Sequence, residues 1–167
     1  LCSPGTVQPA PGELECGKCG AGSFQDVLGA TACENCPAGY YCAEGASAGL
    51  PCPSGRYQNA TLSALNISMT SADDCLTCPA GHFCSTGAEV ATPCSPGTVQ
   101  PLVEQGSCDK CLAGTFQAEI GRTTCETCLA GSFCEAGASA ALPCPEGSYT
   151  SATGLGSSFE CTSCPEG

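Results

Sequence analysis

The residues of this sequence with the greatest capacity for chemistry are its cysteines, which number 19 among 167 residues. This density is typical of small domains held together by disulfides or by bound metal. Histidine occurs once, as His82, and the acidic residues are scattered except for the pair Asp73-Asp74. No cysteine–histidine pattern supplies a nucleophile together with its base. We therefore expect no enzyme activity, no catalytic residue and no cofactor, and we interpret His82 as an ordinary surface residue.

Zinc and disulfides are the two competing roles for these cysteines. The spacing C-x2-C-x13-C-x2-C, which is typical of a four-thiolate zinc site, occurs twice in the sequence, at Cys16, Cys19, Cys33 and Cys36 and again at Cys108, Cys111, Cys125 and Cys128. Against zinc, the cysteine pattern continues through single cysteines, and only four Lys and Arg residues accompany the lone histidine. Two N-glycosylation sequons, at Asn59 and Asn66, have meaning only in the secretory route, where disulfides form. We therefore predict disulfides, no metal, and N-linked glycans on Asn59 and Asn66.

A short repeated phrase organises the cysteines. Cys-x-x-Gly begins at residues 2, 19, 36, 52, 78, 94, 111, 128, 144 and 164, and wherever the phrase can be followed further, the residue two positions after the glycine is apolar or aromatic. A longer period is also visible, because Cys2-Ser-Pro-Gly-Thr-Val-Gln-Pro9 recurs unchanged at residues 94–101. Internal periods of this kind predict a repeat architecture in which each module contacts its neighbours.

These periods define the predicted domain boundaries. Super-repeat 1 spans residues 2–93, with modules 2–18, 19–35, 36–51, 52–77 and 78–93. Super-repeat 2 spans residues 94–167, with modules 94–110, 111–127, 128–143 and 144–163 and the start of another at 164–167. Because the sequence begins one residue before a module and stops within another, we expect it to be a piece of a longer chain.

The module pattern also predicts the disulfide pairs. Each long module is expected to join its first cysteine to the cysteine that opens the next C-x-x-C, which gives Cys2–Cys16, Cys19–Cys33, Cys52–Cys75, Cys94–Cys108, Cys111–Cys125 and Cys144–Cys161. The short C-x5-C loops would close as Cys36–Cys42, Cys78–Cys84 and Cys128–Cys134. Cys164 is then unpaired in this sequence, with its partner expected six residues further on. An interlaced scheme, such as Cys16–Cys33 with Cys19–Cys36, is the main alternative.

Composition limits the kind of fold. Leu, Ile, Val and Phe make up only 24 of the 167 residues, and the net charge is −12. So little apolar surface cannot offset the cost of ordering the backbone, about 1–2 kcal/mol per residue, so covalent bridges must contribute. We predict small disulfide-rich repeats, mostly irregular with short β-hairpins, arranged as an elongated rod or superhelix with minimal helix. Residues 60–74 are the only helical candidate, and the extra aromatic residue Tyr40 is expected to be exposed.

Charge and hydropathy exclude several partners. The excess of acidic over basic residues argues against binding to nucleic acid. No apolar run approaches the roughly 20 residues that span a bilayer, so we expect no membrane insertion. The module that begins at Cys52 is longer than its counterpart at Cys144, and the added residues 59–70 contain both sequons. We expect this insertion to project from the repeat and to carry sugar.

Three phrases point to a known repeat type: C-P-A-G-Y-Y-C at residues 36–42, C-P-A-G-H-F-C at residues 78–84, and C-x-A-G-[ST]-F-Q beginning at Cys19 and Cys111. They resemble the ephrin-receptor-like cysteine-rich repeat family, over essentially the whole chain. Such repeats occur in animal receptor ectodomains and, as long arrays, in surface and mastigoneme-type (ciliary-hair) proteins of protists and algae. The resemblance implies an extracellular, disulfide-bonded rod, broadly similar to epidermal-growth-factor-like modules.

Together these features predict a structural, glycosylated extracellular protein that forms a filament or a cell-surface or ciliary-hair coat. Its expected partners are copies of itself, in a filament or a lateral assembly, and other surface glycoproteins. The alternative is a receptor or adhesin stalk that presents a protein- or carbohydrate-binding site.

Overall fold

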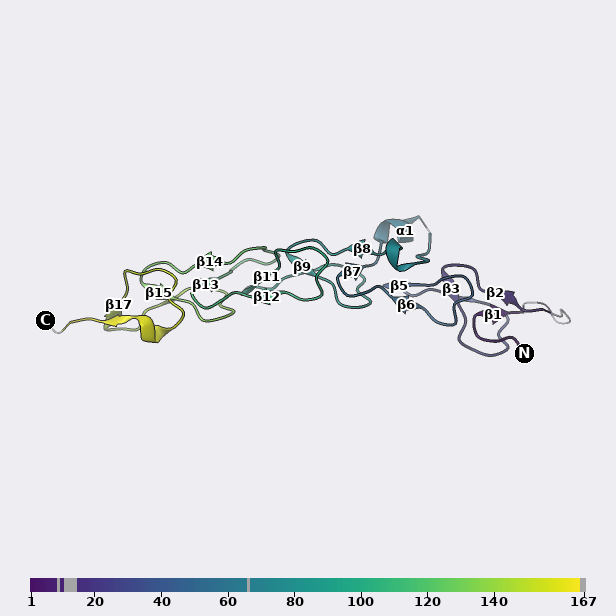
Figure 1. Cartoon of the computed structure of the whole chain (residues 1–167), viewed down its shortest axis with the longest axis horizontal. Helices are drawn as coiled ribbons and strands as arrows, with labels where there is room; N and C mark the ends of the chain where they lie inside the picture. Colours follow the sequence, from purple (N-terminus) through teal and green to yellow (C-terminus); the bar gives the residue numbers. More distant parts are fainter. Residues whose placement is uncertain (9, 11–14, 66, 166–167) are drawn as a thin grey trace. The chain divides into compact units, whose positions relative to one another are not determined.

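The computed structural model describes residues 1–8, 10, 15–65 and 67–165. These residues form nine separate two-stranded antiparallel hairpins, one in each predicted module from 2–18 to 144–163 (Figure 1). Their strands are β1 (Thr6–Val7) with β2 (Gly17–Lys18), β3 (Ser23–Phe24) with β4 (Glu34–Asn35), β5 (Tyr40–Tyr41) with β6 (Leu50–Pro51), β7 (Arg56–Tyr57) with β8 (Leu76–Thr77), β9 (His82–Phe83) with β10 (Thr92–Pro93), β11 (Thr98–Val99) with β12 (Asp109–Lys110), β13 (Thr115–Phe116) with β14 (Glu126–Thr127), β15 (Ser132–Phe133) with β16 (Leu142–Pro143), and β17 (Ser148–Tyr149) with β18 (Thr162–Ser163). The predicted small disulfide-rich repeats with short hairpins are confirmed.

The Cys-x-x-Gly phrase forms the turn that begins each hairpin. In the first module Gly5 has φ +82°, a left-handed conformation that glycine adopts without the steric cost of a Cβ. The next residue, Thr6, donates both its backbone N–H (3.0 Å) and its hydroxyl (2.7 Å) to the carbonyl oxygen of Ser3. The turn therefore delivers Thr6 and Val7 into the first strand.

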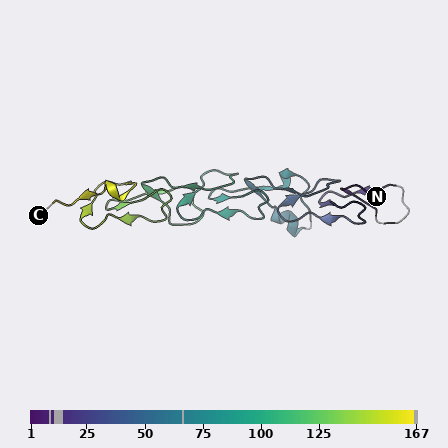
Figure 2. The ribbon, with the colours of Figure 1, turned by 90° about the horizontal axis from the view of Figure 1, so that it is seen from below.

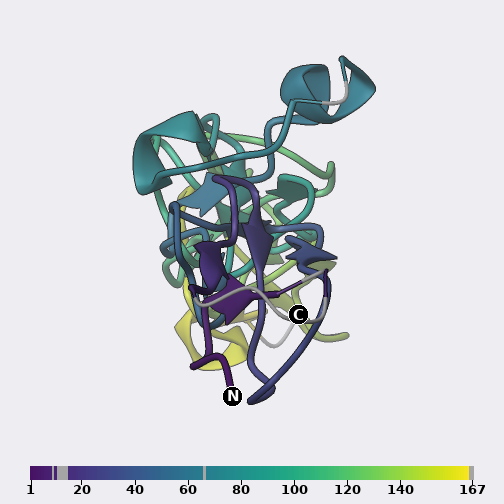
Figure 3. The same cartoon turned by 90° about the vertical axis from the view of Figure 1, so that its right-hand side faces the viewer.

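Helix is minimal within the described residues. The α-helix α1 (Ala60–Ala64) has five residues, and two short 3₁₀ turns cover Ala72–Asp74 and Ser158–Glu160. The first two of these elements lie in the one segment that the sequence identified as a helical candidate. In Figures 1 and 3 the segment that carries α1 stands out from the neighbouring hairpins of its unit.

Sulfur occupies most of the interior. Nine cysteine side chains are less than 2% exposed, whereas Leu112 is 79% and Phe159 96% exposed. The one hydrophobic cluster found among the described residues consists of Cys52, Met69 and Cys75, with Tyr41 and Leu62 packed against it. Tyr41 belongs to the preceding module, so here an aromatic side chain covers a cysteine pair of the next module.

The chain divides into two compact units, residues 1–77 with 84–91 and residues 78–83 with 92–167. Within each unit, two backbone hydrogen bonds recur between successive modules. The turn glycine donates to the residue after the next module's first strand, as in Gly5 to Gln25 and Gly97 to Gln117, both 2.7 Å. The first cysteine of a module accepts from the next module's loop, as in Gly45 to Cys19 and Gly137 to Cys111, also 2.7 Å. In unit 2 the hairpins from β11–β12 to β17–β18 follow one another in chain order (Figure 2).

A third contact joins a module to the next but one, and it occurs in both units. A Cβ built on Gly5 would overlap the carbonyl oxygen of Gly45 in unit 1, and a Cβ on Gly97 would overlap that of Gly137 in unit 2. The backbones meet so closely that only hydrogen fits between them, which is the geometry of a weak Cα–H···O contact. At these positions the glycine of Cys-x-x-Gly is thus required both for its positive φ and for this approach.

One residue departs from the loop pattern. The loop residue that donates to the preceding module's first cysteine is a glycine with positive φ at Gly29, Gly45, Gly87, Gly121, Gly137 and Gly154. Glu104 takes this position in its own module, donates to Cys78 at 2.8 Å, and has φ +60°. The backbone geometry is therefore kept even where glycine is absent, which indicates that the hydrogen bond sets the loop conformation.

A pair of substitutions separates the two roles of the turn glycine. Gly97 and Gly131 have φ +82° and +84°, and each donates its N–H to the next module, but a Cβ on Gly131 meets nothing within 4 Å. Gly131→Ala should therefore cost only the backbone strain, about 1–2 kcal/mol. Gly97→Ala should cost about 1–3 kcal/mol more, because the methyl group overlaps a carbonyl oxygen. Urea unfolding measures both variants, and equal losses of stability would contradict the close approach.

Candidate functional site

Disulfides form the framework on which any site is built. The structure joins Cys2–Cys16, Cys19–Cys33, Cys36–Cys42, Cys52–Cys75, Cys94–Cys108, Cys111–Cys125, Cys128–Cys134 and Cys144–Cys161, with Cα–Cα distances of 5.6 to 6.2 Å. These distances lie within the ordinary range for a disulfide. Cys78 and Cys84 are also disulfide-bonded, and Cys164 is free and exposed.

The eight cysteines with zinc-like spacing are all bonded to other cysteines. Within the described ranges no group of three or more His, Cys, Asp or Glu side chains is placed to hold a metal ion. His82 is half-buried in β9, and its Nδ1 lies 3.2 Å from the carbonyl oxygen of Ala80. The disulfides therefore give the cysteines at these positions a structural role.

Glutamine has a structural role that the cysteine pattern did not reveal. Gln25, Gln100 and Gln117 are at most 5% exposed and follow the first strand of their hairpins. In Gln117, Nε2 donates to the Thr124 carbonyl oxygen (2.8 Å) and Oε1 accepts from the Glu119 backbone N–H (2.9 Å), and the other two repeat this pattern. The amide therefore ties down the loop between the two strands. The signal was present in the sequence, because the residue at this position is Gln in five long modules and Cys in the three short ones.

The inserted segment of the module that begins at Cys52 differs from all of these. Asn59 is the N-cap of α1, and its Oδ1 accepts from the backbone N–H groups of Thr61 (3.2 Å) and Leu62 (3.3 Å). The capping bonds use only the Oδ1 atom of Asn59. The Nδ2 atom, to which an N-linked glycan would be attached, takes no part in them. Asn66, the second predicted glycan site, lies outside the described residues.

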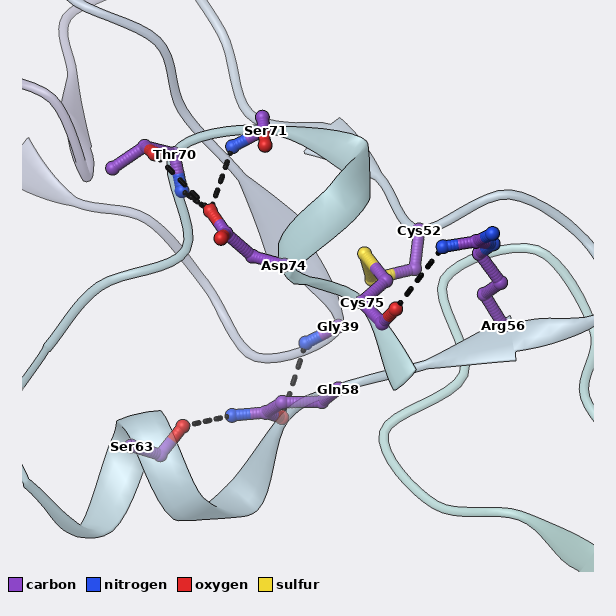
Figure 4. The surroundings of a disulfide bond; sticks show 9 residues. All are labelled: Gly39, Cys52, Arg56, Gln58, Ser63, Thr70, Ser71, Asp74 and Cys75. Atoms are coloured by element: carbon purple, nitrogen blue, oxygen red, sulfur yellow. Dashed lines mark hydrogen bonds between the residues drawn. A yellow bond between two sulfur atoms is a disulfide. The ribbon is translucent and has the colours of Figure 1, made fainter. Parts of the chain in front are cut away.

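Asp74 closes the far end of the insertion (Figure 4). Its Oδ2 accepts from the Thr70 backbone N–H (2.7 Å), the Thr70 hydroxyl (3.1 Å) and the Ser71 backbone N–H (3.0 Å). The hydrogen bond from the Thr70 backbone lowers the pKa of Asp74 most, and the Ser71 bonds lower it further, against the opposing effect of burial. The ionised carboxylate therefore stabilises the turn that leads into Cys75 and its disulfide.

Gln58 has a different task from the other glutamines. Its Oε1 accepts from the Gly39 backbone N–H at 3.2 Å, and its Nε2 donates to the Ser63 hydroxyl of α1 at 2.7 Å (Figure 4). The other turn glycines from Gly5 to Gly131 donate to a main-chain carbonyl, whereas here a side chain replaces it. The insertion and the preceding module are thus joined through one amide.

A cleft of about 320 Å³ opens at this junction, within unit 1. One side consists of residues 35–38 and Tyr40, and the other of Gln58, Ser63 and residues 67–69. Tyr40 is half-buried, so the expectation that it is exposed holds only in part. No pattern in the sequence indicated the cleft, because it depends on how the insertion folds back towards the preceding module.

A comparison with known families finds a match for part of the chain. Residues 97–141 match the sequence model of the family described as tyrosine-protein kinase ephrin type A/B receptor-like. This segment is similar to an ephrin-receptor-like repeat. The match confirms the resemblance seen in the sequence, for the segment from the turn before β11 to the residue before β16.

The ephrin-receptor-like repeat is a non-catalytic extracellular module, which fits the high density of disulfides. No curated protein matches the chain in sequence. Among the described residues, no helix is both long enough and apolar enough to cross a bilayer. Through residues 97–141 the chain resembles an extracellular class of repeat.

The Asp74 carboxylate predicts a pH dependence of stability. Its folded pKa lies below the unfolded value of about 3.9, so its contribution is present above about pH 3.9 and is lost as the pH falls through the folded pKa. Asp74→Asn should lower the free energy of unfolding by about 1 kcal/mol at pH 7, and the difference from the unsubstituted protein should shrink towards about pH 2.

Urea titrations at both pH values measure this effect. Asp73→Asn is the matched control, because Asp73 is exposed and next in sequence, and it should change little at either pH. A loss from Asp74→Asn that is the same at both pH values would contradict the assignment.

Proposed function

We propose that this chain is a structural extracellular glycoprotein, a disulfide-bonded repeat array that assembles with copies of itself into a filament or a cell-surface or ciliary-hair coat. The observation that supports the proposal is the repeated contact between modules. The same turn-glycine and first-cysteine hydrogen bonds occur in unit 1 and again in unit 2. A surface that repeats along a chain also repeats its contacts with a neighbouring copy, which favours head-to-tail or lateral assembly.

Glycosylation is part of this proposal. The sequon at Asn59 lies at the start of α1, in the segment that stands out from the hairpins of unit 1 (Figure 3). A glycan there would cover the insertion without displacing the contacts between modules. Other surface glycoproteins are the further partners we propose.

A receptor or adhesin stalk is the second candidate, and the cleft between residues 35–40 and the insertion is the observation that favours it. A repeat with only a structural role would keep the same main-chain contact between modules at this junction. Here the Gln58 side chain replaces that contact and the cleft opens beside it. The two candidates differ in how the purified protein behaves.

Electron microscopy of the protein secreted from a eukaryotic host tests the proposal. At micromolar concentration we expect regular polymers that disperse with a reductant and persist with a metal chelator, because disulfides and not metal hold each module. Isolated particles under the same conditions would contradict assembly into a filament or coat and would favour the stalk.

A further inference from the structure

The cleft in unit 1 has a lining that is suited to one class of ligand. None of its lining residues is charged, although 16 acidic residues occur in the chain. The lining combines one aromatic ring, Tyr40, with amide and hydroxyl groups and with the thioether of Met69. Its volume of about 320 Å³ lies at the small end of the range for sites that bind small molecules.

Several polar groups at the cleft have hydrogen-bonding capacity to spare. Three side-chain groups form no hydrogen bond with other described residues: the Tyr40 hydroxyl, the side-chain amide of Asn35 and the Ser68 hydroxyl. The Ser63 hydroxyl accepts from Gln58 and so keeps its own hydrogen for donation. Donors and acceptors therefore stand on both sides of the cleft, beside an aromatic ring.

The Tyr40 ring is held in place before any ligand arrives. Tyr40 lies inside the loop closed by Cys36–Cys42 and in strand β5, which pairs with β6. Its ring approaches the backbone at Gly87, where a built Cβ would lie 3.7 Å from Cε2. A ring fixed in this way loses little conformational entropy on binding, which favours affinity.

These features together select among ligands. Charged ligands find no opposite charge in the cleft. An extended peptide would need a free strand edge or a row of aromatic residues, and a single tyrosine lines this cleft. A sugar ring presents hydroxyl groups at its rim and C–H groups on its face, so it can hydrogen-bond to the amides and hydroxyls while it stacks on the tyrosine.

We propose that the cleft formed by Asn35, Tyr40, Gln58, Ser63 and Ser68 binds a neutral saccharide carried by another molecule. Asn59 is not among the residues that line the cleft. We assign the ligand to a glycan of another molecule, and the chain's own N-linked glycans are tested separately. The inference deepens the second of the two candidate functions, since it gives the stalk a binding site and a ligand class.

Saturation-transfer NMR on the secreted, glycosylated protein tests this site. The probes are methyl α-mannoside, methyl β-galactoside, cellobiose and the N-acetylglucosamine disaccharide, with sialyllactose and a neutral proline-rich peptide for comparison. We expect at least one of the four neutral sugars to bind, and we expect sialyllactose and the peptide not to bind. Tyr40→Ala should weaken that binding about tenfold, and Tyr40→Phe should weaken it less, because the ring remains.

His82→Ala is the matched control, since His82 occupies the same place in its own Gly-x-aromatic phrase and lies in unit 2. It should leave sugar binding unchanged. A free-thiol titration on each variant checks that the disulfides have formed. No signal from any neutral sugar, or an equal effect of His82→Ala, would overturn the proposal, and so would binding of the peptide in place of sugar.

Enzymatic removal of the N-linked glycans identifies the source of the sugar. If the ligand comes from another molecule, binding is the same before and after the treatment. Binding that appears only after the treatment would show that the chain's own glycan fills the cleft and would overturn the assignment. Failure to bind sugar leaves the polymers seen by microscopy unaffected, so the two proposals fail separately.

Discussion

The disulfide bond is the interaction on which everything else in this molecule depends. The buried side chains are mostly cysteines, while many leucine, valine and isoleucine side chains lie in solvent. In the chain-entropy model a bridge that closes a loop of about 15 residues stabilises by about 3 kcal/mol, and four of the bridges close loops of this length. Each of these four also brings the two strands of a hairpin together, because the paired cysteines stand just before the turn and just before the second strand. Strands of only two residues persist for that reason.

Glycine is the second constraint, and it acts between modules. The turn glycine donates to the next module, and at Gly5 and Gly97 its bare Cα lies against the backbone of the module after that. Because both contacts are made by the main chain, the side chains elsewhere are free to vary. The junction before Gln58 is where this rule is relaxed. There a glutamine side chain takes the place of a main-chain carbonyl, and the cleft opens beside it.

The hairpins could be predicted from the sequence, because they follow from the spacing of the cysteines and glycines. Contacts between residues that meet only in the folded chain could not. Fixed spacing between Cys, Gly and an aromatic residue predicted hairpins such as β3–β4 and β13–β14, and residues 60–74 were correctly identified as a helical candidate. The loop-tying role of Gln117 was missed, although glutamine recurs at one position, because an amide is informative only once the loop carbonyl it reaches is known. Tyr40 was expected to be exposed and is half-buried, since the insertion and the backbone near Gly87 lie beside it. The elongated rod and the boundaries of the super-repeats stay predictions.

Peptide mapping by mass spectrometry, with the native protein alkylated and digested without reductant, tests the central claim most directly. We expect cross-linked peptides that join Cys94 to Cys108 and Cys111 to Cys125, with no alkylation at these four residues. We expect the same pattern for Cys2, Cys16, Cys19 and Cys33. Alkylated thiols at these positions would contradict the account, because the polypeptide would then lack the bridges that hold its hairpins. Interlaced peptides that join Cys108 to Cys125 would contradict it as well, since each module would then no longer be closed by its own disulfide.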